Sequence, residues 1–426
     1  MIELLFNKKL YVSEIESLTS KSSNKRFMLD KHYVTEGLTL RWVLHNQQYV
    51  IDEIIKNLKN KKYKTPIAIE KSVKTENKER LLYYFDWHEK ILQSAVAKVL
   101  TDLFEPEFSD SLHSYRKGHG TYNTLLAISE YMAKNPEVFI IKKDIKSYGD
   151  NISHNKLFEI LETKIDKKDY FYEVVKKIIQ FKYYSADTKE LKTKSIGLPT
   201  GSQVNNIIAN VFLMGLDKDI DKFKDKSSYF RYGDDICVAT PYEDVAKDIL
   251  NTLESYVAGS GLEFNKEKDG FFFFNKSKDQ KESFKYLGLM VGANGKIFLS
   301  KEKEKELKNS IDKLILKVNM MFSKVSKNKK QKVDSIIGST RVLFSKTQLY
   351  NFLCTYLPVA NDEDYWERID HWVASRILHS VYGMGGDALF AKYPFKEMRE
   401  KGLISIRHLR RILLKDKRKM RNYIKE

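Results

Sequence analysis

The sequence predicts an α+β protein with an all-helical C-terminal region, and three observations support this fold class. Short apolar runs rich in β-branched and aromatic residues recur between residues 66 and 295, which is typical of strands. Helical patterns, with apolar residues three and four positions apart, lie between these runs. From residue 301 onward only the helical pattern continues. A chain of 426 residues is long enough for two or three subdomains.

The charge of the chain predicts a polyanionic partner. Lys and Arg number 75 against 57 Asp and Glu, a formal net charge of +18 in a chain that is 42% hydrophobic. This combination favours a folded protein that binds nucleic acid, although a lysine-rich composition adapted for solubility is the alternative. Residues 401–426 carry much of the excess, so this tail is expected to hold RNA or to be a solvated helix end.

Cysteine usage and hydropathy bear on the compartment. The two cysteines, Cys237 and Cys354, lie in unrelated contexts and form neither a disulfide framework nor a cysteine zinc site. The N-terminus lacks the apolar core of a signal peptide, and no apolar stretch approaches 18 residues. We expect a cytoplasmic, soluble protein that does not contact membranes.

Residues 1–65 have the pattern of helices broken by polar loops. Two predicted strands follow, 67–74 and 80–85, joined by a charged turn. Such a basic hairpin can hold a triphosphate or a template backbone through Lys71 and Arg80, or it can be an ordinary solvated edge.

A helix is predicted over residues 86–104, followed by a basic, glycine-punctuated loop at 115–120. Another helix is expected to begin near Thr121. Backbone amides at a helix start, together with Arg116 and Gly118, make a plausible phosphate cradle, although one such loop is weak evidence.

Three carboxylates form the predicted centre of the site. Residues 230–239 have the pattern of a β-hairpin whose turn carries the adjacent acids Asp234 and Asp235. The predicted buried strand at 138–141 leads to Asp144, which is expected to project into the same cleft. Neighbouring carboxylates repel each other, and a hard divalent cation is the usual reason for their presence, although a solvated Asp-Asp turn is the alternative.

The remaining segments complete the pattern. A loop with Gly and Pro at fixed offsets opens a helix within 196–213, and a further helix is marked by apolar residues from Val245 to Val257. Three short segments precede the helical region that begins at residue 301. They are 262–268, the predicted strand 271–274 and 284–289.

Taken together and in this order, the segments resemble a bacterial reverse transcriptase related to group II intron-encoded enzymes. The matching stretches are the fingers motif at Tyr115 to Gly118, the first palm motif at Asp144 to Tyr148 with His154, the "G-x-P-Q-G … L-A-N" motif at Gly197 to Asn210, the Y-x-D-D signature at Tyr232 to Asp235, "G-L-x-L-N-x-x-K" at Gly261 to Lys268 and the primer-gripping turn at Phe284 to Gly288.

The resemblance implies a right-hand polymerase with fingers, palm and thumb, acting as an RNA-directed DNA polymerase (a nucleotidyltransferase). It divides the chain into an N-terminal helical extension at 1–65, fingers and palm at 66–295, and a helical thumb with a basic C-terminal region at 296–426.

The resemblance also implies roles for individual residues, with two Mg²⁺ ions as cofactors and Mn²⁺ able to substitute. The implied catalytic residues are Asp144, Asp234, Asp235 and Lys268, and the implied metal ligands are Asp144, Ile145, Asp234 and Asp235. The implied nucleotide-binding residues are Lys71, Arg80, Tyr148, Gly149, Pro199 and Gly201. The implied primer or template contacts are Arg116, Gly118, Tyr232, Tyr286, Leu287 and Gly288.

The sequence departs from the family pattern at several positions. Thr200 stands where the family often has Gln, and Asn205-Asn206 stands where Ser-Pro is usual. The aromatic residue that excludes a ribose 2′-OH is replaced by Gly149. Either Tyr148 serves as this gate after a local shift, or sugar discrimination is relaxed.

These departures bear on the kind of reverse transcriptase. The chain has no cysteine zinc cluster and no Val-Thr-Gly of a retron enzyme, and Asn205-Asn206 stands at the position where diversity-generating enzymes carry Ser-Gln. What remains is the antiphage defence or abortive-infection type, which uses a structured non-coding RNA as template and scaffold and makes DNA from dNTPs. Alternatives are an untemplated or protein-primed polymerase, a retron or group II intron-like enzyme, and a subunit that only holds RNA. The sequence also leaves an oligomer open.

Overall fold

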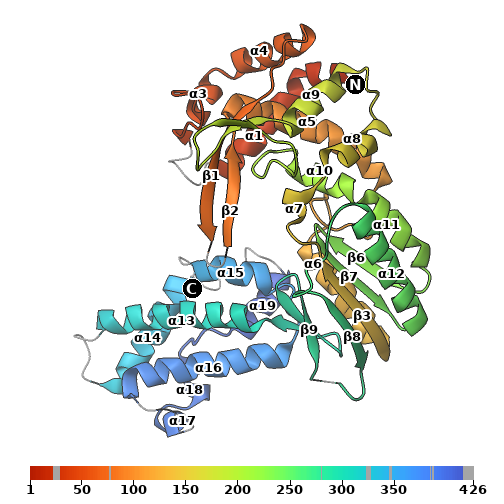
Figure 1. Cartoon of the computed structure of the whole chain (residues 1–426). Helices are drawn as coiled ribbons and strands as arrows, with labels where there is room; N and C mark the ends of the chain where they lie inside the picture. The colour runs from red at the N-terminus through yellow and green to blue at the C-terminus, as the bar shows by residue number, and fades with distance from the viewer. Residues whose placement is uncertain are drawn as a thin grey trace. The chain divides into compact units, whose positions relative to one another are not determined.

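The computed structural model describes residues 1–22, 29–75, 78–279, 281–322, 328–344, 348–383, 385 and 388–415 (Figure 1). The chain forms two compact units. Unit 1 contains Met1–Gly120 and Phe139–Phe272, and unit 2 contains Thr121–Val138 and Phe273–Glu426. Helices and strands are interspersed up to residue 299, and only helices follow in the described part, which confirms the α+β class and the helical C-terminal region.

The N-terminal part of unit 1 is helical, as predicted. It contains the 3-10 helix η1 (Ile2–Phe6) and the α-helices α1 (Lys8–Ser22), α3 (Leu40–His45), α4 (Gln47–Lys59) and α5 (Trp87–Phe104). The apolar face of α4 is buried because its large residues recur at helical spacing, and they join the core of unit 1.

The predicted basic hairpin is confirmed as β1 (Ile67–Thr75) and β2 (Lys78–Tyr84), an antiparallel pair whose charged turn lies outside the described residues. A second hairpin, β4 (Lys182–Tyr184) and β5 (Leu191–Thr193), extends it to a four-stranded sheet in the order β2-β1-β4-β5. Strands β1 and β4 pair in parallel, which requires the long connection between them.

A second sheet carries the acidic residues. Its strands are β6 (Ser228–Tyr232), β7 (Asp235–Thr240), β3 (Glu137–Asp144) and β8 (Gly270–Asn275), in the order β6-β7-β3-β8. Most side chains of β7 are buried, as expected of a central strand. The remaining α-helices of unit 1 are α7 (Tyr148–Asn151), α8 (His154–Glu162), α9 (Tyr170–Ile179), α10 (Asn205–Phe212), α11 (Met214–Ile220) and α12 (Glu243–Gly259).

Unit 2 combines α6 (Thr121–Lys134) with a three-stranded sheet in the order β11-β10-β9 and a set of helices. The strands are β9 (Ser283–Tyr286), β10 (Leu289–Gly292) and β11 (Ile297–Leu299). The helices are α13 (Lys301–Phe322), α14 (Lys329–Phe344), α15 (Gln348–Tyr356), α16 (Glu363–Tyr382), α17 (Ala388–Lys392), α18 (Phe395–Glu400) and α19 (Ile406–Lys415). In the described part of the chain, no helix is long and apolar enough to cross a membrane.

Candidate active site

The acidic hairpin and the third acid meet on one face of the second sheet. Tyr232 is the register partner of Asp235, and Asp235 is the register partner of Asp144. Because directly opposed residues of antiparallel strands point to the same face, these side chains form a row across β6, β7 and β3. The turn itself contains only Gly233 and Asp234, and Gly233 supplies the positive φ that a two-residue hairpin needs. The predicted turn was one residue too long, since Asp235 begins β7.

Lys268 closes the row at the β3 side. Its Nζ lies 2.9 and 2.8 Å from the two carboxylate oxygens of Asp144. The backbone holds these groups in place, because the Asn265 N–H donates to the Asp144 carbonyl at 2.7 Å and the Ile145 N–H donates to the Asp234 carbonyl at 3.3 Å. The structure therefore brings the predicted catalytic residues together.

The carboxylates also interact through their charges. Burial and then the charges of Asp234 and Asp144 raise the pKa of Asp235, Lys142 and Lys268 lower it, and the net result is a pKa of about 6. Burial is also the main cause that raises the pKa of Asp234. The site therefore concentrates negative charge that these lysines only partly balance.

The donor set fits a hard divalent cation, which takes carboxylate oxygens as ligands. No group of three or more His, Cys, Asp or Glu in the described part of the chain is arranged as a metal site, and the Asp144 carboxylate faces Lys268 instead. The acids are thus close together without forming a complete ligand shell. Metal ligation by Asp144, Ile145, Asp234 and Asp235 stays a prediction.

A buried ion pair supports the hairpin of β6 and β7, and the sequence did not predict it. The fully buried Arg231 donates to the two carboxylate oxygens of Asp217 at 2.6 and 2.5 Å, and its Nη1 donates to the Gly233 carbonyl at 3.1 Å. The Tyr229 hydroxyl donates to Asp217 at 2.8 Å. Arg231 therefore fixes the turn that carries Asp234. An arginine between apolar strand residues was the available signal.

The predicted nucleotide loop at 196–204 is held by close backbone contacts. Gly197 and Gly201 have positive φ, and a Cβ at either would lie within 2.6 Å of a neighbouring carbonyl oxygen, that of Asp150 or Tyr83. Only glycine fits such positions. Pro199 is buried, whereas Gly201 is exposed. Nucleotide contact by Pro199 and Gly201 stays a prediction.

A chain of polar contacts also anchors this loop, and the sequence analysis missed it as well. The Ser202 hydroxyl donates to Gln93 Oε1 at 2.7 Å, and Gln93 Nε2 donates to Glu89 at 2.9 Å. The Tyr63 hydroxyl donates to the same Glu89 oxygen at 2.8 Å. Because Gln93 is fully buried, it ties the loop rigidly to α5.

The basic hairpin presents its two predicted cations on one face. Arg80 is the register partner of Val73, and Lys71 lies two residues before Val73 on the same strand, so their side chains share a face. Both side chains are exposed. The charge of Arg80 lowers the pKa of Asp234, which places this arginine within electrostatic reach of the acids. Triphosphate binding by Lys71 and Arg80 stays a prediction.

The structure corrects the prediction for Tyr148. Its ring is only 5% exposed, and its hydroxyl donates to the Ala209 carbonyl at 2.5 Å. Tyr148 is part of the core and is not placed to contact a nucleotide or to act as a sugar gate. At Gly149 a Cβ would meet nothing within 4 Å, so the space where the family has an aromatic side chain is open.

Arg116 lies in the fingers loop with its guanidinium occupied by protein. Its Nε donates to Glu105 at 2.8 Å, and its Nη1 donates to the carbonyls of Ser109 and Leu112. The side chain is 8% exposed, so its observed role is to brace the loop. Gly118, by contrast, is exposed and has positive φ. Contacts of both residues with primer or template stay predictions.

The remaining predicted primer contacts lie in unit 2. Tyr286 is fully buried, so its ring is not available for such a contact. Leu287 and Gly288 form the two-residue turn between β9 and β10, both with positive φ. A leucine in this conformation is strained, which is characteristic of functional turns. The primer contact of this turn stays a prediction.

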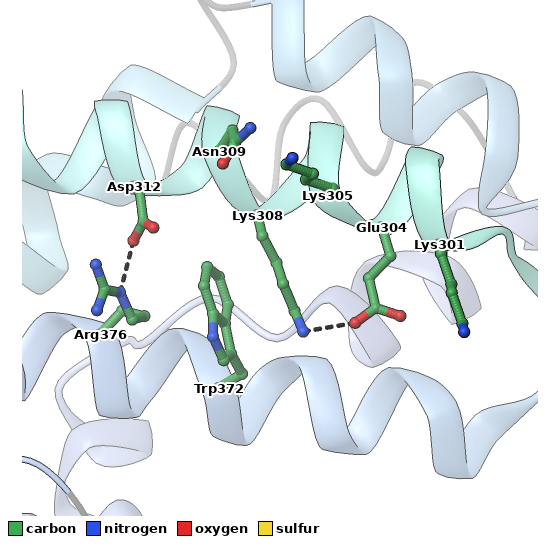
Figure 2. A pocket seen from close by; sticks show the side chains of 8 residues that line it. All are labelled: Lys301, Glu304, Lys305, Lys308, Asn309, Asp312, Trp372 and Arg376. Atoms are coloured by element: carbon green, nitrogen blue, oxygen red, sulfur yellow. Dashed lines mark hydrogen bonds and ion pairs between the residues drawn. The ribbon is translucent and has the colours of Figure 1, made fainter.

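A second charged cluster, the α13–α16 groove, lies in unit 2 (Figure 2). Its two carboxylates are paired, Glu304 with Lys308 at 2.5 Å and Asp312 with Arg376 at 2.7 Å. Trp372 lies between these pairs (Figure 2), with Lys308 Nζ 5.3 Å from its ring centroid. The groove therefore has the contacts of an interhelical packing site.

The basic tail is only partly described. Residues 416–426, which hold half of its cations, lie outside the described residues, so RNA clamping by the tail stays a prediction. In the described part, Arg407, Arg410 and Arg411 of α19 all form ion pairs with Glu363.

The fold, with its acidic row on a four-stranded sheet, is that of the right-hand polymerase class. Residues 69–291, about half of the chain, match the model of the family described as reverse transcriptase (RNA-dependent DNA polymerase). The chain belongs to this family.

Individual relatives agree with this assignment. The chain is 31% identical over 184 residues to the "Uncharacterized 91 kDa protein in cob intron" of Schizosaccharomyces pombe, covering 42% of this chain and 22% of that protein. It is 28% identical over 202 residues to the group II intron-encoded protein LtrA of Lactococcus lactis, covering 46% of this chain and 33% of LtrA. The chain thus spans about a fifth to a third of the length of these relatives.

Among solved structures, a telomerase from Candida albicans in complex with a fragment of telomeric RNA aligns with a TM-score of 0.47 and 14% identity. This alignment covers 87% of the present chain and 70% of the telomerase chain.

Proposed function

We propose that this protein is an RNA-directed DNA polymerase that adds deoxynucleotides by two-metal nucleotidyl transfer. The row of Asp144 and Asp235 beside Asp234, closed by Lys268, is the observation that carries the proposal. Divalent ions, with Mg²⁺ as the physiological choice and Mn²⁺ able to substitute, would activate the attacking hydroxyl and stabilise the leaving pyrophosphate. Asp144, Asp234, Asp235 and the main-chain carbonyl of Ile145 would hold these ions.

Lysine and arginine side chains of the protein would bind and neutralise the phosphate groups. Lys268 lies at the end of the acidic row, where it can neutralise the pyrophosphate as negative charge develops on it. Lys71 and Arg80, on one face of the basic hairpin, would hold the triphosphate. The rigid loop anchored by Gln93 would support the nascent base pair.

We further propose that Gly149 leaves sugar selection relaxed. A Cβ added at Gly149 would meet no atom of the described residues within 4 Å, and Tyr148 beside it is buried. A nucleotide with a 2′-OH would therefore meet no obstacle at this position. Deoxynucleotides and ribonucleotides should be compared in the same primer-extension assay, and ribonucleotide incorporation as rare as in ordinary reverse transcriptases would contradict this point.

The biological role that we propose is antiviral defence in bacteria, with a structured non-coding RNA as template and scaffold. Two features support it: the Asn205-Asn206 departure from the other groups, and the helical region from α13 to α19. Sequencing of the RNA that co-purifies with the protein and of the DNA that it makes, with and without phage infection, tests this role. The same DNA found without a discrete RNA template would favour untemplated or protein-primed synthesis.

The polymerase activity is tested with a double variant. Asp234→Ala with Asp235→Ala should abolish extension of a primed RNA template while leaving RNA binding nearly unchanged, because the variant removes negative charge from the site. Asp312→Ala, which removes a carboxylate from the α13–α16 groove, is the matched control and should keep activity. Residual synthesis by the double variant would overturn the assignment.

A further inference from the structure

Tyr115 has an unusual conformation and exposure. Its φ is +59°, in the left-handed region that bulky side chains rarely adopt, and its side chain is 58% exposed. Strained backbone of this kind persists only where neighbouring contacts impose it, and it is concentrated at functional sites. An exposed aromatic side chain on a strained backbone is therefore a candidate for contact with a ligand.

The residues on either side of Tyr115 impose this conformation. The buried Ser114 donates through its hydroxyl to Asn210 Oδ1 at 2.9 Å, and Asn210 Nδ2 donates back to the Ser114 carbonyl at 2.9 Å. On the other side, the Arg116 guanidinium is held by Glu105 and two carbonyls. Because both neighbours are anchored inward, the Tyr115 ring is directed outward.

The ring is directed to the catalytic hairpin. The preceding segment runs along the edge of β6, since the Arg231 N–H donates to the Ser111 carbonyl and the His113 N–H donates to the Arg231 carbonyl, both at 2.9 Å. As a result, the centroids of the Tyr115 and Tyr232 rings are 6.2 Å apart. Partial burial, the Tyr232 hydroxyl and the charge of Asp234 raise the pKa of Tyr115, so its hydroxyl is within electrostatic reach of the acidic turn.

The order of the side chains across the sheet indicates which part of the substrate Tyr115 and Tyr232 would contact. Tyr232 lies on β6, Asp235 on β7 and Asp144 on β3, with Lys268 on Asp144. In an in-line displacement the attacking and leaving oxygens lie on opposite sides of the phosphorus. If Lys268 neutralises the leaving pyrophosphate, the strand that supplies the attacking hydroxyl lies on the aromatic side.

We propose that Tyr115, whose ring lies beside that of Tyr232 with the two ring planes at 45° to each other, is a stacking platform for the terminal base of the strand that is being extended. This proposal rests on the proposed polymerase function. Stacking on an aromatic face tolerates any base, which suits a site that every product nucleotide must occupy in turn. The platform is rigid because its backbone is anchored at Ser114 and Arg116.

The test uses substitutions at Tyr115 and a stacking-sensitive probe. A primer with 2-aminopurine at its 3′ end should be quenched on binding to the wild-type protein. The quenching should be lost in Tyr115→Ala, and the KM for the primed template should rise about tenfold. Tyr115→Asn is a second variant that suits left-handed backbone, so it should lose quenching while folding at least as well.

Two controls separate stacking from other roles. Tyr115→Phe keeps the ring and should behave like the wild type, so a loss in this variant equal to that of Tyr115→Ala would overturn stacking in favour of the hydroxyl. Tyr49→Ala removes another exposed tyrosine, 61% exposed with its ring 6.4 Å from that of Trp42, and should change nothing.

The outcomes distinguish this proposal from the proposed function. Equal quenching and equal KM in the wild type and Tyr115→Ala, with normal DNA synthesis, would overturn the stacking platform alone. Quenching that depends on Tyr115 without any DNA synthesis by the wild type would overturn the polymerase function and support the binding site.

Discussion

Two charged clusters of this protein differ in how completely their charges are compensated. In the α13–α16 groove of unit 2, both carboxylates have a cation within 2.7 Å (Figure 2). In the acidic row of unit 1, Lys268 contacts Asp144 while burial and mutual repulsion raise the pKa of Asp235 to about 6. Buried, mutually repelling carboxylates with a raised pKa are typical of functional sites, so we interpret the groove as a packing contact and the acidic row as the candidate functional site.

The buried pair of Arg231 and Asp217 is a third charged cluster. Here each charge has an opposite charge in contact with it, and solvent is excluded. Its side chains are fully buried and in close contact, so neither charge can be satisfied by water if the other is removed. This cluster supports the acidic row because Arg231 Nη1 also donates to the Gly233 carbonyl in the turn.

The largest predicted effect follows from breaking this pair. Arg231→Met should destabilise the protein by about 3–5 kcal/mol, because it leaves the Asp217 carboxylate buried without a partner. The shift in the midpoint of urea unfolding measures the loss. Adding Asp217→Leu should recover part of it.

The groove supplies the matched control for this prediction. Asp312→Asn removes one partner of the more exposed pair with Arg376 and should cost less than about 1 kcal/mol. Equal losses at the two sites would show that burial does not set the value of these pairs.

A smaller effect is expected at Glu89, whose carboxylate accepts hydrogen bonds from Tyr63 and Gln93 and forms no ion pair within the described part of the chain. Burial raises its pKa to about 7, so the folded protein holds this proton more tightly than the unfolded chain. The stability that Glu89 contributes is therefore present at low pH and lost as the pH rises through 7, by at most about 3 kcal/mol. Glu89→Gln keeps the acceptor for Tyr63 and Gln93 and should raise the melting temperature more at pH 8 than at pH 5.

The opposite pH dependence is expected from Glu107, because Lys164 and Lys218 lower its pKa. Glu107→Gln should therefore cost stability at neutral pH rather than add it. An unchanged pH dependence of melting in Glu89→Gln would contradict the role given to Glu89.

The sequence predicted elements whose pattern is local. Periodicity and turn residues located the basic hairpin, the acidic hairpin and the helices α5, α6, α10 and α12, because these signals lie within a few neighbouring residues. The convergence of Asp144 with the hairpin was also predicted, because an acidic side chain at the end of a buried strand is expected to project into a cleft. The extra residue assigned to the turn shows the usual uncertainty of an element's boundary.

The sequence did not predict features that depend on tertiary burial. Tyr148 and Arg116 lie in predicted functional motifs. In the structure the Tyr148 ring is buried, and the Arg116 guanidinium is hydrogen-bonded to protein groups. No local sequence pattern distinguishes such side chains from exposed ones. The contact of Gln93 with Ser202 joins residues 109 positions apart, beyond the reach of periodicity. Tyr115 lies in the predicted fingers motif, but its left-handed backbone and its exposure are visible only in the structure.

The central claim is that Asp144, Asp234 and Asp235 together bind divalent cations, and Mn²⁺ binding tests it most directly. Titration of the wild-type protein with Mn²⁺, followed by the loss of the free-ion electron paramagnetic resonance signal, should show binding. Asp144→Asn with Asp234→Asn should weaken this binding at least about tenfold, a loss of about 1.4 kcal/mol or more, whereas Asp312→Asn should leave it unchanged. Equal Mn²⁺ binding by the wild type and the Asp144 and Asp234 variant would contradict the account.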